Sequence, residues 1–328
     1  RAMDQGLVVP ESKIMDIPVS YGGYTPYNQS ESFQGMVTVE EALTGSLNAP
    51  AVNILNIYGV NKFYQFLQKA GVESLTRSPE EYGLSLILGG AEVSLWELNQ
   101  LYCGLGNQGQ FSEISMVEET HPKESIGESQ GNTGDKLITT GSAYLTLEML
   151  AKVKRPGLER SWRRFRSGSK LAWKTGTSYG NRDAWAVGVN PDWTIAVWLG
   201  DFAGGECKGM TGFKTAGSLL FRIFNQLESY NYSGNWFERP EADLKKITVS
   251  AETGYRLQSK MNITREVWAP ASAHDLRYSP YEKIVYLNKE GTRQVCSLCW
   301  ERGQVQKVLK VVYPNGVIKY YQERGNYS

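Results

Sequence analysis

The stretch that decides the fold is Lys174-Thr175-Gly176-Thr177-Ser178, because it closes a run of strand-forming residues that begins at Lys170. Two more short runs, enriched in Trp, Val, Ile and Ala, follow at 183–189 and 193–200. Asn190-Pro191-Asp192 between them is a turn signal. The pattern therefore predicts three consecutive strands, of which the last two form an antiparallel hairpin.

Helical patterns flank this strand segment on both sides. Thr38-Val39-Glu40-Glu41 has the form of a capping box, since the threonine hydroxyl can accept a backbone N–H while the glutamate reaches back to the cap. Further helices are expected over 61–70, 94–106 and 140–153, and an amphipathic helix over 213–228. This order predicts an α+β fold in which helices flank a small antiparallel sheet.

The pattern also divides the chain into two domains. The first 36 residues are rich in Gly, Pro, Tyr and Ser, and we expect them to be extended chain on the surface. A polar, aromatic stretch with Pro240 marks a boundary, so a main domain is expected over 1–236 and a small β-rich module over 244–328. Strand-like runs within that module lie at 247–249, 284–287 and 308–312.

Composition excludes some classes of partner. The chain has 328 residues, of which 41% are hydrophobic and 21% charged, as in a globular protein with a sizeable core. Its 35 basic and 34 acidic residues nearly cancel, so we expect neither nucleic acid nor an anionic membrane surface as a partner. The start at Arg1 shows neither an initiator methionine nor a signal peptide, and we expect the chain to be an internal piece of a longer protein.

The cysteines predict no metal site and no cofactor. Cys296-Ser297-Leu298-Cys299 has the spacing of half a zinc site, but a tetrahedral site needs two more ligands. The other cysteines and the histidines show no paired spacing; they are Cys103, Cys207, His121 and His274. A local disulfide between Cys296 and Cys299 is the favoured interpretation, and two free thiols remain the alternative.

The Lys174 stretch has residues suited to acyl transfer. Opening an acyl bond through a serine requires a proton acceptor, a proton donor for the leaving amine, and donors that face the developing oxyanion. The Lys174 ammonium raises the local positive potential, and Gly176 leaves room for a substrate backbone beside the strand. The hydroxyls of Thr175 and Thr177 fall on the same strand face, where they can hold a carboxylate. Taken alone, the motif is also compatible with a strand-end turn.

Ser46-Leu47-Asn48 is the second candidate motif. It is expected in a helix–loop context, where its two polar side chains can converge on one cleft. The serine would relay protons, and the amide of Asn48 would grip carbonyl or amide groups of a substrate. Alone the motif is weak, and Ser46 and Asn48 would then be interpreted as helix-surface or capping residues.

The wider sequence resembles the transpeptidase domain of class A penicillin-binding proteins, most closely the 1C subtype. The block around Lys174 is the most specific part, because a tryptophan precedes the lysine and Ser-Tyr-Gly follows Thr177. The region from Ile247 to Cys299 is similar to the module that follows this domain in the 1C subtype. The stretches that carry the resemblance include Tyr24-Thr25-Pro26-Tyr27-Asn28, Ser46-Leu47-Asn48-Ala49-Pro50-Ala51-Val52, Ala172 to Gly180 and Arg182 to Gly188.

The resemblance implies a penicillin-binding, serine β-lactamase-like fold and a peptidoglycan D,D-transpeptidase. In such enzymes a serine attacks the D-Ala-D-Ala amide, D-alanine leaves, and an amine from a neighbouring stem peptide resolves the acyl-enzyme. Ser46 would then shuttle protons, Asn48 would contact the acyl part of the substrate, and Lys174 would support Ser46 electrostatically. The segment 175–178 would bind the substrate, with Thr175 and Thr177 on its carboxylate and the Thr177 N–H as an oxyanion donor.

The nucleophile of the family is missing from its expected place. Such enzymes carry a serine and a lysine one helical turn apart, S-x-x-K, before the Ser46 motif, and no such pattern occurs there. The one literal match, Ser167-Gly168-Ser169-Lys170, comes after Ser46 and lies in a glycine-containing loop, where the two residues would not share a helix face. We therefore expect the serine upstream of Arg1 and the chain alone to be inactive.

The resemblance also implies a cellular setting. Stem peptides and β-lactams are the expected ligands, other cell-wall synthesis proteins are possible partners, and the expected location is the periplasmic side of the bacterial inner membrane. A glycosyltransferase domain and a membrane anchor would precede this chain. Two other functions remain open: a carboxypeptidase or β-lactamase on the same scaffold, which an acidic deacylating residue near the cleft would favour, and a non-catalytic envelope-binding module.

Overall fold

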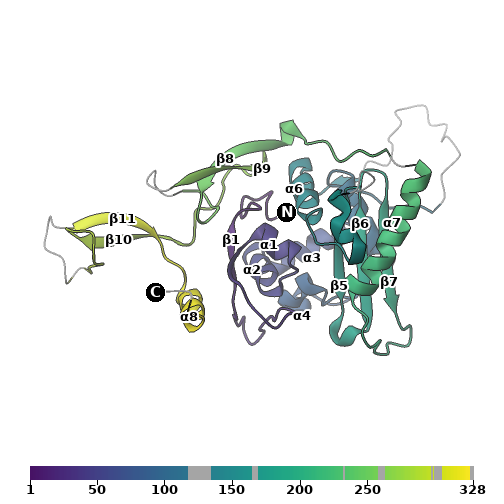
Figure 1. Cartoon of the computed structure of the whole chain (residues 1–328), viewed down its shortest axis with the longest axis horizontal. Helices are drawn as coiled ribbons and strands as arrows, with labels where there is room; N and C mark the ends of the chain where they lie inside the picture. The colour runs from purple at the N-terminus through teal and green to yellow at the C-terminus, as the bar shows by residue number, and fades with distance from the viewer. Residues whose placement is uncertain are drawn as a thin grey trace.

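A three-stranded antiparallel sheet lies on one side of the main body, to the right in Figure 1. The computed structural model describes residues 1–116, 134–164, 169–231, 233–257, 263–296, 298 and 305–325. The sheet contains β5 (Ala172–Thr177), β6 (Asp183–Val189) and β7 (Thr194–Gly200), in that order. All three predicted strands are confirmed, and β5, which carries the lysine motif, lies at one edge of this sheet.

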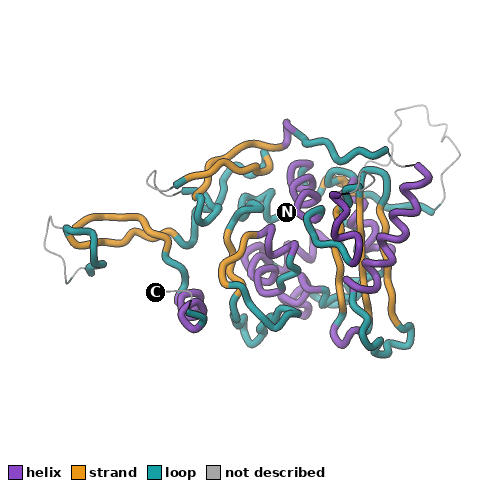
Figure 2. The backbone as a smooth tube through the Cα atoms, viewed as in Figure 1, coloured by secondary structure: helices purple, strands orange, loops and turns teal. Residues whose placement is uncertain are grey.

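The two faces of the sheet carry different helices. The register places Trp173, Gly188 and Ile195 in one row on the face that α7 (Gly217–Asn231) covers. Trp173 is fully buried, and its ring meets that of Phe221 edge-on at 4.9 Å between centroids. On the opposite face, Gly106 at the end of α5 approaches Val189 so closely that a Cβ would lie 2.8 Å from a valine methyl group. The sheet is thus a layer between helices, and the predicted α+β class is confirmed (Figure 2).

The helices upstream of the sheet contribute to several cores, including the one that covers the sheet. They are α1 (Val39–Thr44), α2 (Asn48–Tyr58), α3 (Val60–Lys69), α4 (Pro79–Tyr82), the 3₁₀ turn η1 (Gly83–Leu88), α5 (Leu95–Gly106) and α6 (Thr140–Leu150). The capping box at Thr38 is present, because its hydroxyl accepts the Glu41 N–H at 3.1 Å while the Glu41 carboxylate accepts the Thr38 N–H at 2.7 Å. The helix patterns of the sequence are confirmed, with ends that shift by a few residues.

The first 36 residues differ from the expectation of surface chain. They contain β1 (Lys13–Asp16), which pairs with β2 (Gly35–Thr38), and Val9 and Ile14 are fully buried. Ile14 packs in one core with Tyr255 and Tyr281 from the far end of the chain. The prediction was wrong because the apolar residues of this stretch, such as Leu7-Val8-Val9, follow no regular helix or strand period, and the cores that they join form by long-range pairing.

The region after Asp243 consists of two hairpins and a helix. These elements are β8 (Leu244–Ser250) with β9 (Thr264–Pro270), β10 (Glu282–Asn288) with β11 (Val305–Val311), and α8 (Asn315–Glu323). The region packs on the N-terminal segment: the Lys13 N–H donates to Thr253 O at 2.8 Å, and the Tyr321 hydroxyl of α8 accepts the Met36 N–H at 2.8 Å. The domain boundary between 236 and 244 stays a prediction.

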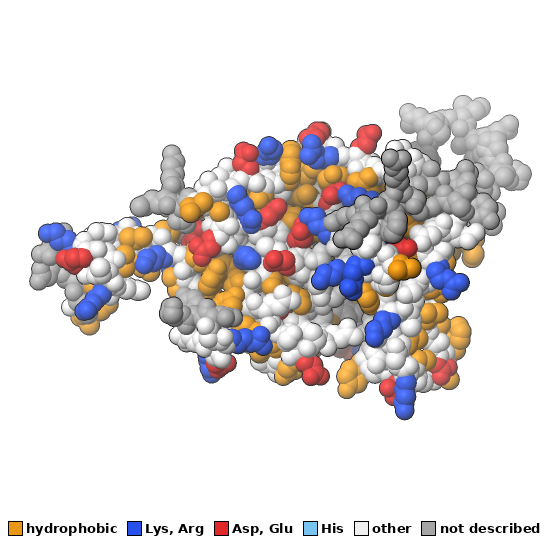
Figure 3. All heavy atoms as spheres, in the orientation of Figure 1, with side chains coloured by type: hydrophobic (Ala, Val, Ile, Leu, Met, Phe, Trp, Pro, Cys, Tyr) orange, Lys and Arg blue, Asp and Glu red, His pale blue; other side chains and the backbone are white. Residues whose placement is uncertain are grey.

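Short elements complete the description: β3 (Gln110–Phe111), β4 (Asp135–Lys136), η2 (Gly157–Arg164), η3 (Tyr179–Asn181), the π-helical η4 (Gly212–Ala216) and η5 (Glu241–Asp243). Acidic and basic side chains are interspersed on the face in Figure 3, in line with the balanced composition. Among the helices that the structure describes, none has both the length and the hydropathy that a bilayer crossing requires.

Candidate active site

The loop between α1 and α2 places Ser46 in an unusual backbone conformation. Gly45 is the C-cap of α1, the Ser46 N–H donates to Leu43 O at 3.2 Å, and the Leu47 N–H donates to Ala42 O at 2.9 Å. This hydrogen-bond pair is the Schellman arrangement, in which the residue after the cap adopts the left-handed conformation. Ser46 occupies that position with φ of 53°. Glycine is the usual residue there, so the serine side chain is retained at a conformational cost, as is frequent at functional sites.

The strand motif and the loop meet at this serine. The Lys174 ammonium of β5 donates to the Ser46 hydroxyl, although the two residues are 128 positions apart in the sequence. The same ammonium donates to the Thr175 carbonyl at 3.0 Å. The side chains that the sequence predicted to share one site, Ser46 and Lys174, are therefore in direct contact.

Burial adjusts the acidity of the lysine. Loss of hydration disfavours the charged form and lowers the pKa of Lys174 from 10.5 to about 8. A pKa in this range lets the ammonium lose and regain a proton near neutral pH, which suits a group that supports proton transfer. Among the described residues, no carboxylate contributes to this shift.

Asn48 is the first residue of α2 and is held at both its backbone and its side chain. Its N–H donates to the side-chain oxygen of Asn28 at 2.7 Å, and its Nδ2 donates to the Tyr27 carbonyl at 2.6 Å. The carboxamide of Asn48 is thus oriented by the 27–28 segment, two residues from Ser46. Its contact with a substrate stays a prediction.

The hydroxyls after Lys174 have structural partners. The register confirms that Thr175 and Thr177 share a strand face, opposite the face of Lys174. Thr177 Oγ1 accepts the Gly212 N–H at 3.0 Å, and Ser178 Oγ accepts the Asp183 N–H at 2.8 Å. These bonds fix the end of β5 against η4 and β6. The expected roles of Thr175 and Thr177 in carboxylate binding, and of Ser178 beside them, remain predictions.

Gly176 leaves open space beside the strand. The residue is exposed, and a Cβ at this position would lie 3.6 Å from the nearest atom, the Cβ of Trp185. An alanine would therefore fit without moving its neighbours. Packing inside the protein therefore does not require glycine at this position. This agrees with the predicted approach of a substrate backbone to the strand.

Sequence reasoning gave no role to Asn28 and Asp16, which support the Ser46 loop. Both side chains are buried, and Asn28 Nδ2 donates to Asp16 Oδ1 at 2.8 Å. Asn28 lies within a stretch that carries the family resemblance, but its position 20 residues before Asn48 gives no local pattern that links the two. Only the tertiary contact shows the connection.

Two sequence predictions involve residues outside the described ones. Cys299 is one such residue, so its predicted disulfide with the exposed Cys296 stays a prediction. Ser167 of the rejected S-x-x-K match also lies outside the described residues.

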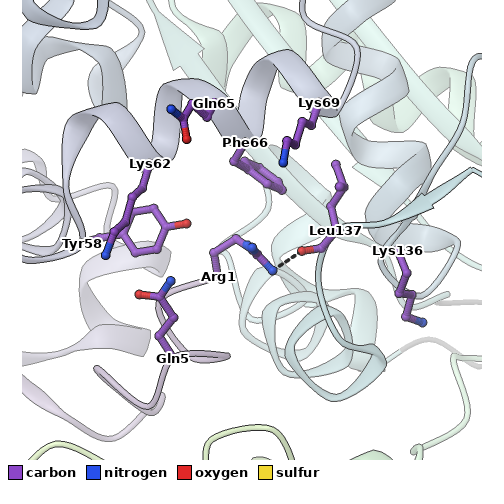
Figure 4. A pocket seen from close by; sticks show the side chains of 9 residues that line it. All are labelled: Arg1, Gln5, Tyr58, Lys62, Gln65, Phe66, Lys69, Lys136 and Leu137. Atoms are coloured by element: carbon purple, nitrogen blue, oxygen red, sulfur yellow. Dashed lines mark hydrogen bonds between the residues drawn. The ribbon is translucent and has the colours of Figure 1, made fainter.

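A separate pocket of about 200 Å³ lies away from Ser46 and Lys174 (Figure 4). Helix α3 contributes several of its walls, and Arg1 projects into it and donates to the Leu137 carbonyl. None of the predicted site residues lines this pocket. Its lining residues are Arg1, Gln5, Tyr58, Lys62, Gln65, Phe66, Lys69, Lys136 and Leu137.

Comparison with known proteins agrees with this geometry. The family described as "Penicillin binding protein transpeptidase domain" matches residues 1–219. Penicillin-binding protein 1C of Escherichia coli (strain K12) is 35% identical over 228 residues, which are 70% of this chain and 28% of the relative. Penicillin-binding protein 1F of Bacillus subtilis (strain 168) is 34% identical over 211 residues, 61% of this chain and 28% of the relative. The chain thus spans little more than a quarter of the length of these relatives.

Solved structures show the same fold. Penicillin-binding protein 1A from Haemophilus influenzae superposes with a TM-score of 0.65 at 18% identity, covering 85% of this chain and 47% of that one. PonA1 from Mycobacterium tuberculosis in complex with penicillin V superposes with a TM-score of 0.59 at 20% identity, covering 72% and 68%. The resemblance to class A penicillin-binding proteins of the 1C type is confirmed, and the chain belongs to the penicillin-binding protein transpeptidase domain family.

Proposed function

We propose that this chain is part of a peptidoglycan D,D-transpeptidase that β-lactams acylate. The observation that carries the proposal is the contact between the Lys174 ammonium and the Ser46 hydroxyl in a chain of the transpeptidase family. A partly buried lysine with a pKa of about 8 beside a serine hydroxyl forms a short path for protons. The left-handed backbone of Ser46 adds support, because a non-glycine residue is kept where glycine would be easier.

In this proposal Ser46 and Lys174 handle the protons of acyl transfer. The nucleophilic serine is proposed to belong to an S-x-x-K segment, whose lysine takes the serine hydroxyl proton. The serine Oγ forms a bond to the acyl carbon while the bond to the leaving amine breaks. Ser46 delivers a proton to that amine and is resupplied from Lys174. Asn48 contacts the acyl part of the substrate, the Thr177 N–H faces the oxyanion, and the terminal carboxylate binds near Thr175 and Thr177.

The same reasoning extends to partners and location. Stem peptides are the proposed substrates, and penicillin binding is supported by the PonA1 complex with penicillin V. The periplasmic side of the inner membrane is the proposed location, since the relatives are penicillin-binding proteins of bacteria. Other wall-synthesis proteins are the further partners that this proposal includes.

A hydrolase on this scaffold is the less favoured alternative. Hydrolysis of the acyl-enzyme calls for a base that activates water, and a carboxylate near Lys174 would serve. Among the described residues, none contributes to the electrostatics of that lysine. Products of the acyl-enzyme distinguish the two: transfer to an added amine supports the transpeptidase, and release of free acid alone supports the hydrolase.

Labelling of the full-length gene product with a fluorescent penicillin tests the proposal. We expect covalent labelling of the wild type, and labelling slowed by about tenfold to a thousandfold in Ser46→Ala and Lys174→Met, by analogy with the loss of other proton-transfer groups. Ser218→Ala is the matched control, because its hydroxyl lies on α7 and donates only to the Lys214 carbonyl. A protein that carries S-x-x-K and takes no label would contradict the enzyme assignment and favour the binding module.

A further inference from the structure

We propose that Asn28, oriented by the buried carboxylate of Asp16, is a positioning residue that fixes the Ser46-Leu47-Asn48 turn for catalysis. This inference rests on the proposed function of Ser46 and Asn48, and it assigns a role to a residue outside both motifs. Neither Asn28 nor Asp16 contacts Lys174 in the described structure. Their effect on the site therefore passes through the α1–α2 loop.

Asn28 caps helix α2 from another part of the chain. The first N–H groups of a helix have no partner inside it and need an acceptor. Leu47 stands at the cap position and makes no side-chain cap bond. Asn28 Oδ1 takes this place and accepts the N–H of Asn48 at 2.7 Å and that of Ala49 at 3.5 Å.

Asp16 determines which way the Asn28 amide faces. A carboxylate accepts hydrogen bonds only, so its contact selects the NH₂ end of the amide. Asn28 Nδ2 donates to Asp16 Oδ1 at 2.8 Å and to the Ser32 carbonyl at 2.9 Å, which leaves Oδ1 directed at α2. The second Asp16 oxygen accepts the Gln34 N–H at 2.8 Å. Asp16 is fully buried and Asn28 is 3% exposed, so water does not compete for these bonds.

The segment holds Asn48 by two independent bonds. Asn28 fixes the backbone N–H, and the neighbouring Tyr27 carbonyl accepts from the Asn48 side chain at 2.6 Å. On the other side of the turn, the Schellman bonds of α1 fix Ser46. The turn is thus fixed at both ends. Bonds within α1 hold the Ser46 end, and the distant Asn28 holds the Asn48 end.

The first experiment measures amide hydrogen exchange in the full-length protein. We expect Asn28→Ala to speed exchange of the Asn48 and Ala49 amides by about tenfold or more, because both lose their acceptor. Asn53→Ala is the matched control: Asn53 is a buried asparagine of the same helix, and its side chain donates to the Tyr21 hydroxyl at 3.2 Å. Unchanged exchange at Asn48 and Ala49 in Asn28→Ala would overturn the inference, whatever the enzyme does.

The second experiment measures the rate of fluorescent-penicillin acylation in the full-length protein. We expect a loss of about tenfold or more for Asn28→Ala and a change of less than about twofold for Asn53→Ala. Wild-type protein that takes no label would contradict the proposed function. The amide-exchange experiment would still test whether Asn28 caps α2. Labelled wild type with equally fast Asn28→Ala would overturn the inference and leave the function standing.

Exchanging the two polar groups provides a rescue that a merely stabilising role would not give. Asn28→Asp keeps an acceptor for α2 but places two carboxyl groups 2.8 Å apart, so we expect slow acylation. Adding Asp16→Asn restores a donor opposite an acceptor at this contact, while the bond to the Ser32 carbonyl stays lost, so the rate should recover only in part, by about threefold or more over Asn28→Asp alone. A double variant that folds and stays as slow as Asn28→Asp would overturn the inference, even where Asn28→Ala fails to fold.

Discussion

Replacing Ser46 with glycine should give a more stable protein than replacing it with alanine. Both changes remove the hydroxyl that Lys174 contacts, so this loss cancels in the comparison. The backbone at Ser46 has φ of 53°, where a Cβ costs roughly 1–2 kcal/mol and glycine has no such cost. Glycine has a larger entropy in the unfolded chain, which offsets roughly 0.5–1 kcal/mol of this gain. The net expectation is about 1 kcal/mol in favour of Ser46→Gly.

Thermal and urea unfolding of the two variants measure this difference. For a chain of this size, about 1 kcal/mol corresponds to roughly 2 °C in Tm. Ser218 near the start of α7 is the matched control, because it has right-handed helical backbone, where alanine should be more stable than glycine by up to about 1 kcal/mol. The sign of the Gly–Ala difference should therefore reverse between the two sites. A Ser46→Gly variant no more stable than Ser46→Ala would refute the strain argument, and fluorescent-penicillin labelling should be slow in both.

Three further outcomes follow from the site. Because the pKa of Lys174 is lowered to about 8 from 10.5, the unfolded chain binds more protons than the folded chain between these values. The free energy of unfolding of the wild type should therefore rise from pH 8 to 10 relative to Lys174→Met. Urea midpoints of the two proteins that run parallel across this range would contradict the lowered pKa. Thr177→Val leaves the Gly212 N–H without its acceptor and should lower the free energy of unfolding by about 1–2 kcal/mol, whereas Thr177→Ser should not. Gly176→Ala fits beside Trp185 and should leave Tm within about 2 °C, yet slow penicillin labelling in the full-length protein; unaffected labelling would remove the proposed substrate approach at this strand.

Local patterns were sufficient where the structure depends on neighbours in sequence. The capping box at Thr38 and the turn at 190–192 involve residues within a few positions of one another, and both elements form as predicted. The strands β5 to β7 were likewise readable from short apolar runs. Motif identity also came from sequence, because Lys174 and Ser46 each stand in a distinctive local context.

Long-range contacts were beyond the reach of these patterns. Residues 1–36 were expected on the surface, but Ile14 is fully buried in a core completed by Tyr255 and Tyr281. Helix α8, which anchors Met36 through Tyr321, was not predicted, although Val317, Tyr320 and Tyr321 have the spacing of one helix face. In both cases the stabilising partner lies more than 200 positions away.

The amino-acid sequence by itself determined the central strands, most helices and the two motifs of the site, because propensity, capping and turn chemistry act over a few residues. Only the tertiary structure decided that Ser46 adopts a left-handed conformation, that Lys174 reaches it, and that Asn28 caps α2. These features depend on hydrogen bonds and burial between distant segments. Such contacts exist only once the chain has packed, so no local pattern encodes them.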